Sequence, residues 1–155
     1  LRSNATILYG HIEHYSHRID HLKRLRDLQD QTGGFQTFIP LKFRNKENDM
    51  SDIEEVTLIE DLKMYAVSRI YLDNFPHIQA SWFSEGKKTG QIALHFGADD
   101  FGGTLLEENV HAAANFINKT NTQECIQLIH ESGFDAAQRG TLYEIKEIFS
   151  KIKAA

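Results

Sequence analysis

Short apolar segments alternate with longer amphipathic ones along the chain, and this alternation limits the possible folds more than any other feature. The apolar segments are predicted strands at residues 5–9, 35–39, 77–82 and 98–101. The amphipathic segments that follow them are predicted helices at residues 16–31, 57–72, 87–96 and 105–116. Repeated strand–helix order predicts parallel strands joined by right-handed helical crossovers. We therefore expect an α/β fold with four parallel βα units.

Two architectures are built from such units, a doubly wound sheet and a (β/α)8 TIM-type barrel. A complete barrel takes about 250 residues, whereas this chain has 155. Four units in this length would form the second half of a barrel, followed by C-terminal helices at residues 121–133 and 141–152. We expect residues 1–155 to form a single domain. Because the chain opens with Leu1 rather than a methionine, we also expect it to be a fragment of a larger parent protein.

Local signals place several helix ends. Gly33 and Gly34 are expected to stop the first helix, whose apolar residues recur every three positions at Ile19, Leu22, Leu25 and Leu28. Two later pairs have the spacing of a capping box, in which each side chain bonds the other's free backbone N–H: Thr57 with Glu60, and Asn121 with Glu124.

Composition excludes several classes of protein. The net charge of -5 comes without a basic stripe, so we expect no nucleic-acid partner. No apolar run approaches the ~20 residues of a membrane span, and we expect no membrane partner. The single cysteine, Cys125, cannot form an internal disulfide and fits a reducing, cytoplasmic location. We interpret it as a packing residue of a helix.

Chemistry in parallel α/β folds gathers at the carboxyl ends of the strands, so polar and aromatic residues at those places are candidates for a binding site. We expect a pocket for a small-molecule substrate there, without assigning a catalytic residue. Seven residues are predicted to line it: His11, Glu13, Lys42, Gln79, Trp82, Asp99 and Arg139.

Five of these candidates have a simpler interpretation as well. His11 and Glu13 alternate after a strand, so both could face a polar ligand, or they could tie down the loop. Lys42 could neutralise a carboxylate or phosphate, or lie at the surface. The pair Asp99-Asp100 could hold a ribose hydroxyl or cap the next segment. Trp82 is more often a packing residue than a stacking platform.

Three histidines at positions 14, 17 and 21 have the spacing that shares one helical face. They lack the intervening glutamate of the HExxH zinc motif, and His14 precedes the predicted helix. We expect His17 and His21 to face solvent, and no metal site.

Five long segments resemble the C-terminal half of one radical S-adenosylmethionine family. They read ATILYGHIE, HRIDHLKRLRDLQDQTGGFQTFIPLKF, EDLKMYAVSRIYLDNFPHIQASW, HFGADDFGGTLLEENV and AQRGTLYE, and they cover nearly the whole chain in order. The family contains aminofutalosine synthase, dehypoxanthine futalosine cyclase and a related deazaflavin-forming enzyme. The first two act in the futalosine route to menaquinone.

The resemblance implies a (β/α)8 barrel with a [4Fe-4S] cluster that cleaves S-adenosylmethionine to a 5′-deoxyadenosyl radical. In the synthase the radical adds to a carboxyvinyloxy-benzoate, and in the cyclase it abstracts hydrogen before a ring closes. Three cysteines spaced CxxxCxxC hold such a cluster, but this chain has one cysteine. Its cluster ligands are therefore absent, and we expect the isolated chain to be inactive.

The segments PLKFRNKEN and EDLKMYAVSRIYLDNFPH look like the synthase, which we favour, whereas HIQASW, EENV and AAQRGTLYE look like the cyclase. A different class also remains open: a non-catalytic module that binds a small ligand, or a subunit that completes a split barrel. A half barrel has an open sheet edge and an exposed inner face. We expect self-association through that edge, or an inner face left partly exposed.

Overall fold

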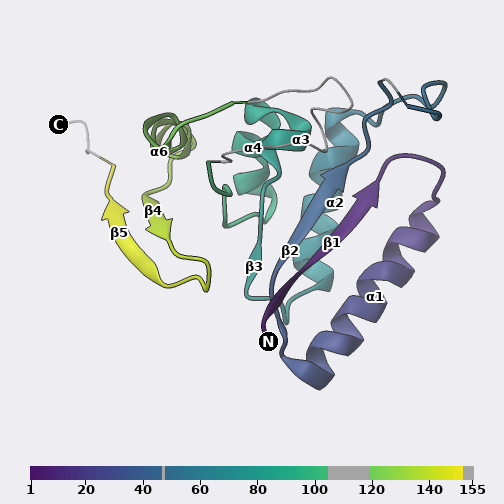
Figure 1. The fold of residues 1–155 in the computed structure, drawn as a ribbon, viewed down its shortest axis with the longest axis horizontal. Coiled ribbons are helices and arrows are strands. Elements are labelled where there is room, and N and C mark those ends of the chain that lie inside the picture. The colour runs from purple at the N-terminus through teal and green to yellow at the C-terminus, as the bar shows by residue number, and fades with distance from the viewer. Residues whose placement is uncertain (47, 105–118, 152–155) are drawn as a thin grey trace.

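A parallel three-stranded sheet forms the centre of the protein. The computed structural model describes residues 1–46, 48–104 and 119–151. The sheet has the order β1-β2-β3, with β1 at Ser3–Tyr9, β2 at Phe35–Lys42 and β3 at His77–Ile78. Its crossovers are α1 (Tyr15–Thr32) and α2 (Leu58–Tyr71). Figure 1 shows β1 and β2 running in the same direction, with α1 beside β1. The predicted α/β class and the first two βα units are confirmed.

The remaining elements follow β3 in the chain. They are α3 (Trp82–Glu85), α4 (Lys87–Ala93), the 3-10 helix η1 (Leu94–Phe96), α6 (Thr122–Glu131), β4 (Ala136–Arg139) and β5 (Ile145–Phe149). Helix α6 packs on α4, where Gln91 donates to the carbonyl of Leu128 at 2.9 Å. Beneath this contact Trp82, Phe101 and Leu128 form a small apolar cluster. Among the described residues, no helix combines the length and apolar character that crossing a bilayer requires.

The sheet has two different faces. Three register pairs are buried on the side of α1 and α2, which we call the helix face: Ala5 with Phe38, Ile7 with Pro40 and Tyr9 with Lys42. The alternate pairs lie on the other side, which we call the open face: Thr6 with Ile39 and Leu8 with Leu41. Leu8 is 52% exposed there. Because side chains alternate along a strand, this register decides which residues the core receives.

Helix α1 ends where the sequence predicted, since Gly33 adopts the left-handed conformation (φ +57°) and donates to the carbonyl of Gln29. The predicted apolar stripe is only partly buried. Leu22 is inaccessible, whereas Ile19 and Leu28 are exposed. The polar Gln29 is buried instead, because its side chain bonds both the N–H and the carbonyl of Phe35 at 2.9 Å.

The two capping boxes have different outcomes. Asn121 caps α6 by accepting from the N–H of Glu124 at 2.9 Å, which is one of the two bonds of the predicted box, whereas the Glu124 carboxylate accepts from Lys87 and Thr120. Thr57 precedes α2 but makes no side-chain cap bond, so that prediction is wrong. Its expected partner, Glu60, accepts from Tyr15 and Lys63 instead.

The third and fourth predicted strands are shorter than expected. Strand β3 pairs with β2 only at its two residues, and Gln79 forms one isolated parallel bridge with Asp100. Ser81 then turns the chain into α3, because its hydroxyl donates to Pro40 O at 2.6 Å and its N–H donates to the Tyr65 hydroxyl. The four full units are thus reduced to three strands and a bridge. The predicted helix at 105–116 lies outside the described residues.

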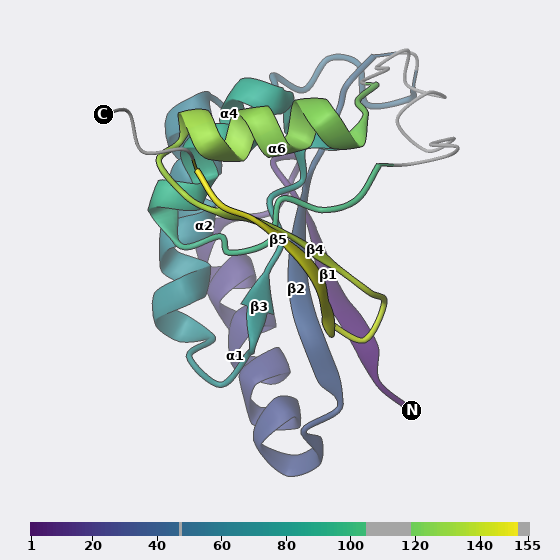
Figure 2. The same ribbon diagram turned by 90° about the vertical axis from the view of Figure 1, so that its left-hand side faces the viewer.

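The predicted C-terminal helix at 141–152 is wrong. Strands β4 and β5 form an antiparallel hairpin, which Figure 2 shows in front of the parallel strands. Its tip packs on the open face: the Tyr143 ring stacks on His77 at 4.0 Å, and Gln36 donates to the carbonyl of Thr141. The tip therefore covers the amino-terminal end of that face.

Replacement of Gln29 by alanine should destabilise the fold. It would leave the N–H and carbonyl of Phe35 without their side-chain partner, which costs about 1–3 kcal/mol of unfolding free energy. Urea denaturation followed by circular dichroism measures this. The matched control is Gln31→Ala on the exposed side of the same helix. Equal midpoints for the two variants would contradict the bracing role of Gln29.

Candidate functional site

The carboxyl ends of β1 and β2 lie side by side because the strands are parallel, and they form a mouth with the turn after β3. Tyr9 and Lys42, the last residues of their strands, are register partners. The residues beyond them, Gly10 to Glu13 and Phe43 onward, leave the sheet at this point. Phe43 still donates its N–H to the carbonyl of Tyr9 at 2.8 Å.

A small cavity of about 460 Å³ opens beside the end of β1, lined by His11, Glu13 and Arg18 among others. Glu13 accepts hydrogen bonds from the N–H groups of Gly10 and His11, at 2.6 and 2.8 Å, and from Arg18 at 2.7 Å. Burial opposes ionisation of this carboxyl group, but these bonds outweigh burial and lower its pKa to about 2. The Glu13 side chain is therefore ionised at neutral pH, and both its oxygens already accept hydrogen bonds from the loop.

The His11 side chain has longer contacts than Glu13 has. Its Nδ1 lies 3.4 Å from Glu13, its Nε2 lies 3.3 Å from the carbonyl of Leu8, and its ring meets Phe43 edge-on. The adjacent Gly10 has φ +89°, and a Cβ there would lie 2.9 Å from Val56. The turn that presents His11 thus requires glycine.

Lys42 lies on the helix face rather than at the surface. Its side chain is 9% exposed, and its Nζ donates to Asp61 at 3.0 Å and to the carbonyl of Val56 at 2.6 Å. The Tyr9 hydroxyl donates to the other oxygen of Asp61 at 2.8 Å. This placement favours a structural role, in which one carboxylate of α2 holds the ends of both β1 and β2.

A second buried link joins α2 to the turn after β3. The Tyr65 hydroxyl donates to Glu85 at 2.5 Å and accepts from the N–H of Ser81. Burial raises the pKa of Glu85 to about 8, against the opposing hydrogen bond from Tyr65. Burial likewise raises the pKa of Asp61, although Lys42 and Tyr9 oppose it. All three parts of the mouth are thus anchored to α2.

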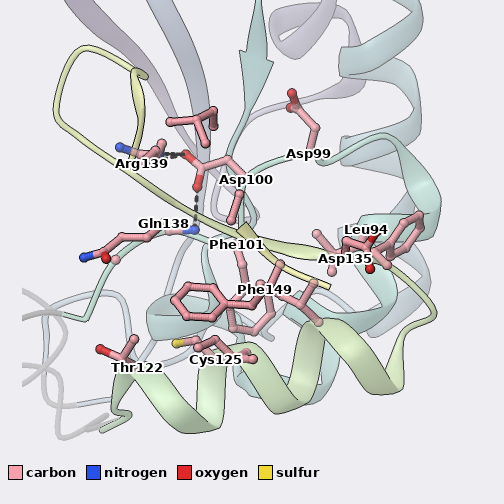
Figure 3. A pocket seen from close by; sticks show the side chains of 18 of the residues that line it. Leu94, Asp99, Asp100, Phe101, Thr122, Cys125, Asp135, Gln138, Arg139 and Phe149 are labelled. Carbon is pink, nitrogen blue, oxygen red and sulfur yellow. Dashed lines mark hydrogen bonds and ion pairs between the residues drawn. The ribbon is translucent and has the colours of Figure 1, made fainter. Parts of the chain in front are cut away.

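A larger cavity of about 580 Å³ lies between residues 98–104, α6 and the hairpin, and Figure 3 shows its lining. At its edge Arg139 donates to Asp100 through two nitrogens, at 2.6 and 3.0 Å. The Tyr143 hydroxyl donates to the same oxygen at 2.6 Å, and Gly102 N–H donates to the other. Asp100 therefore anchors the hairpin.

Asp99 and Trp82 face other partners. Asp99 accepts from the N–H of Ile78 and from Arg69, both at 2.7 Å, and so ties α2 to β3. Trp82 is buried against Phe101 in the small apolar cluster. Gln79 lies next to Gly102, where a Cβ would meet its amide at 3.1 Å.

The seven predicted residues therefore do not form one cluster. His11 and Glu13 share the smaller cavity, Asp99 and Arg139 line the larger one, Lys42 and Trp82 are buried, and Gln79 bridges to Asp100. Sequence reasoning missed Tyr143 and Asp61 as anchoring groups. The alternation of side chains along a strand could have indicated Asp100, rather than Asp99, as the residue that holds the hairpin. Asp100 is the one that forms the isolated β-bridge with Gln79. Within the described ranges, no three His, Cys, Asp or Glu side chains gather so that they could hold a metal ion.

Comparison with known proteins gives a consistent result. Residues 32–152 match the family model described as the CofH/MqnC C-terminal region. The chain is 45% identical, over 93% of its length, to the cyclic dehypoxanthine futalosine synthase of Streptomyces coelicolor, of which it covers 36%. It is 43% identical, over 94% of its length, to the aminodeoxyfutalosine synthase of the same organism, of which it covers 41%.

A third relative has a different printed activity. The chain is 42% identical, over 94% of its length, to the 5-amino-6-(D-ribitylamino)uracil–L-tyrosine 4-hydroxyphenyl transferase of Methanoculleus marisnigri, covering 41% of it. The chain thus spans about two fifths of the length of the curated relatives it matches.

Replacement of Lys42 by methionine should destabilise the protein strongly. It leaves Asp61 buried without its cation, and removing one partner of a buried pair costs roughly 3–5 kcal/mol. Adding Asp61→Asn should recover part of the loss. Guanidinium unfolding of both variants tests this, with the exposed Lys63→Met as a control expected to stay near wild type. A single variant as stable as that control would argue against the buried anchor.

Replacement of Glu85 by glutamine should flatten the pH dependence of stability. Between pH 4.5 and about 8 the unfolded carboxyl group has lost its proton while the folded one keeps it. The unfolding free energy therefore falls by up to about 1.4 kcal/mol per pH unit in this range and levels off above it. Urea titrations at pH 5, 6, 7 and 8 should show a smaller slope for Glu85→Gln than for wild type. The exposed Glu54→Gln should keep the wild-type slope, and identical slopes in all three would disprove the expectation.

Proposed function

Because this chain belongs to the family of the CofH/MqnC C-terminal region, we propose that it is the C-terminal half of a radical S-adenosylmethionine enzyme of menaquinone biosynthesis, an aminofutalosine synthase. The observation that carries the proposal is the family match over residues 32–152. The 43% identity to an aminodeoxyfutalosine synthase supports it, and the segments PLKFRNKEN and EDLKMYAVSRIYLDNFPH favour the synthase over the cyclase. The parallel sheet with helices on one face also supports the proposal, because this is half the construction of a (β/α)8 barrel.

The cluster of such an enzyme does not fit the residues of this chain. A [4Fe-4S] site needs several thiolates, whereas Cys125 is the single cysteine. It lies half-buried in α6, with Sγ 3.6 Å from the Thr120 hydroxyl. The cluster and its radical chemistry belong to the part of the parent protein that the relatives carry outside the matched region.

This chain would supply part of the wall around the substrate. The open face carries Leu8, Ile39 and Leu41, which suit the flat aromatic ring of a benzoate. The hairpin tip closes the amino-terminal end of that face through Tyr143 and His77. A substrate would therefore enter from the mouth, where His11 lies.

The sheet also has the free edge that a half barrel requires. Among the described residues β1 pairs with β2 alone, and Leu8 is 52% exposed on the open face. We propose that further parallel strands of the parent barrel pair with β1. In their absence the same edge could pair with another copy of the chain.

A cyclase is the second candidate. The segments HIQASW and AAQRGTLYE resemble that enzyme, and the cyclic dehypoxanthine futalosine synthase of Streptomyces coelicolor is 45% identical to this chain. Both candidates place the chain in the same half of the same kind of barrel.

Anaerobic reconstitution of the intact parent protein tests the function. After incubation with iron, sulfide and S-adenosylmethionine, the protein is given the carboxyvinyloxy-benzoate or dehypoxanthine futalosine, and the products are identified by mass spectrometry. We expect aminofutalosine from the first substrate. A cyclised product from the second would support the cyclase, and turnover of neither would reject both. The 155-residue chain treated in the same way is the control, and it should show no cluster absorbance.

A further inference from the structure

Asp100 divides its two carboxyl oxygens between two parts of the protein. One oxygen, Oδ2, accepts from two nitrogens of Arg139, at 2.6 and 3.0 Å, and from the Tyr143 hydroxyl at 2.6 Å. The other, Oδ1, accepts from the N–H of Gly102 at 2.8 Å. The Asp100 side chain is 8% exposed, so water can do little to replace these donors. The hairpin and the segment after Phe101 therefore depend on one carboxyl group.

These two parts lie towards opposite ends of the sheet. Asp100 forms a parallel bridge with Gln79, so the chain beyond Asp100 leaves the sheet at the same edge as the ends of β1 and β2. The hairpin tip covers the opposite end, where Tyr143 stacks on His77. Residues 102–104 line the larger cavity, beside which Figure 3 shows Arg139 reaching Asp100.

The segment at residues 102–104 has few restraints of its own. Its first two residues are glycines, which lose more conformational freedom on folding than any other residue. Gly102 has φ +82°, and a Cβ built on Gly103 would meet nothing within 4 Å. The bond from Gly102 N–H to Asp100 closes an Asx turn, in which a side chain holds the backbone two residues on. The position of Oδ1 therefore sets the shape of this segment.

The position of Oδ2 is set by the hairpin. Tyr143 has φ +68°, which a tyrosine adopts only where surrounding contacts fix it. Its hydroxyl bonds Asp100, its ring stacks on His77 at 4.0 Å, and the Arg139 guanidinium lies 4.1 Å from the ring centroid. These contacts hold three donors in place around Oδ2. Because the two oxygens belong to one planar group, a fixed Oδ2 also fixes Oδ1.

We propose that Asp100 is a positioning residue, through which the docked hairpin sets the shape of residues 102–104 in the cavity wall. We call the contacts of Asp100 with Arg139, Tyr143 and Gly102 the Asp100 link. Loss of the hairpin donors would leave Oδ2 buried without a partner, which is costly. The carboxyl group would then turn towards other donors and release Gly102. The role in ligand binding rests on the proposed function, whereas the link itself consists of described residues of this chain.

Hydrogen exchange of the Gly102 amide measures the link directly. The intact parent protein is labelled in heavy water and analysed by mass spectrometry with electron-transfer fragmentation, which resolves single amides. Tyr143→Phe removes one donor to Oδ2 and keeps the ring on His77, while Arg139→Met removes the other two donors. We expect Gly102 to exchange about tenfold faster in each variant. The Gly33 amide, which donates to Gln29, should keep its rate.

Two further variants distinguish the link from a general loosening of the hairpin. Gln36→Ala removes the contact of the tip with Thr141 but none of the donors to Asp100. Its Gly102 amide should exchange as in wild type. Arg139→Lys keeps a cation that can give Asp100 a single hydrogen bond. It should restore part of the protection that Arg139→Met loses.

Steady-state kinetics of the reconstituted parent protein measure the consequence for the ligand. With the carboxyvinyloxy-benzoate, Arg139→Met should raise KM about tenfold and keep kcat within about twofold, because a displaced wall weakens binding of substrate and transition state alike. Gln36→Ala should change neither constant. A variant that merely unfolds in part would lower kcat by its inactive fraction and keep KM, so the two cases are distinguishable.

Each outcome decides one of the two proposals. Unchanged Gly102 exchange in both Tyr143→Phe and Arg139→Met would overturn the link. Equally fast exchange in Gln36→Ala would also overturn it, since loosening of the hairpin would then be the cause. Faster exchange with an unchanged KM would overturn the positioning role. If the parent protein turns over neither substrate, the proposed function fails, while the exchange rates still decide the link.

Discussion

The structure depends most on a carboxylate that is buried with its partners. Asp61 of α2 receives the Tyr9 hydroxyl and the Lys42 ammonium, the last side chains of two neighbouring strands. Burying charges is costly unless they are paired and hydrogen-bonded, and here both carboxylate oxygens have donors. The contact fixes the relative positions of the two strand ends and of Val56, whose carbonyl Lys42 also binds. The segments that form the mouth leave the sheet from the strand ends that this contact fixes.

The two faces of the sheet differ in what covers them. The helix face is occupied by apolar side chains and by the buried polar links of α2, including the contact between Tyr65 and Glu85. The open face carries Leu8, which is 52% exposed, and Ile39. The hairpin limits this face at one end, because Asp100 holds both Arg139 and Tyr143.

The loop after β1 is closely connected to the strand itself. His11 belongs to the loop that Glu13 holds and also reaches back to the carbonyl of Leu8. His11 is also a lining residue of the smaller cavity. One imidazole thus contacts both the end of β1 and the wall of the cavity.

The sequence by itself determined the class of fold, the positions of β1, α1 and α2, the helix stop at Gly33 and the kinship shown by long matching segments. These follow from periodicity and turn chemistry, which act over a few residues. Only the tertiary structure decided that Lys42 faces Asp61, that Arg139 binds Asp100, and that residues 145–149 form a strand instead of a helix. Side-chain direction depends on the register between strands distant in sequence. A short segment such as 145–149 takes its conformation from its neighbours, since its own propensity is weak beside the hydrogen bonds that β4 offers.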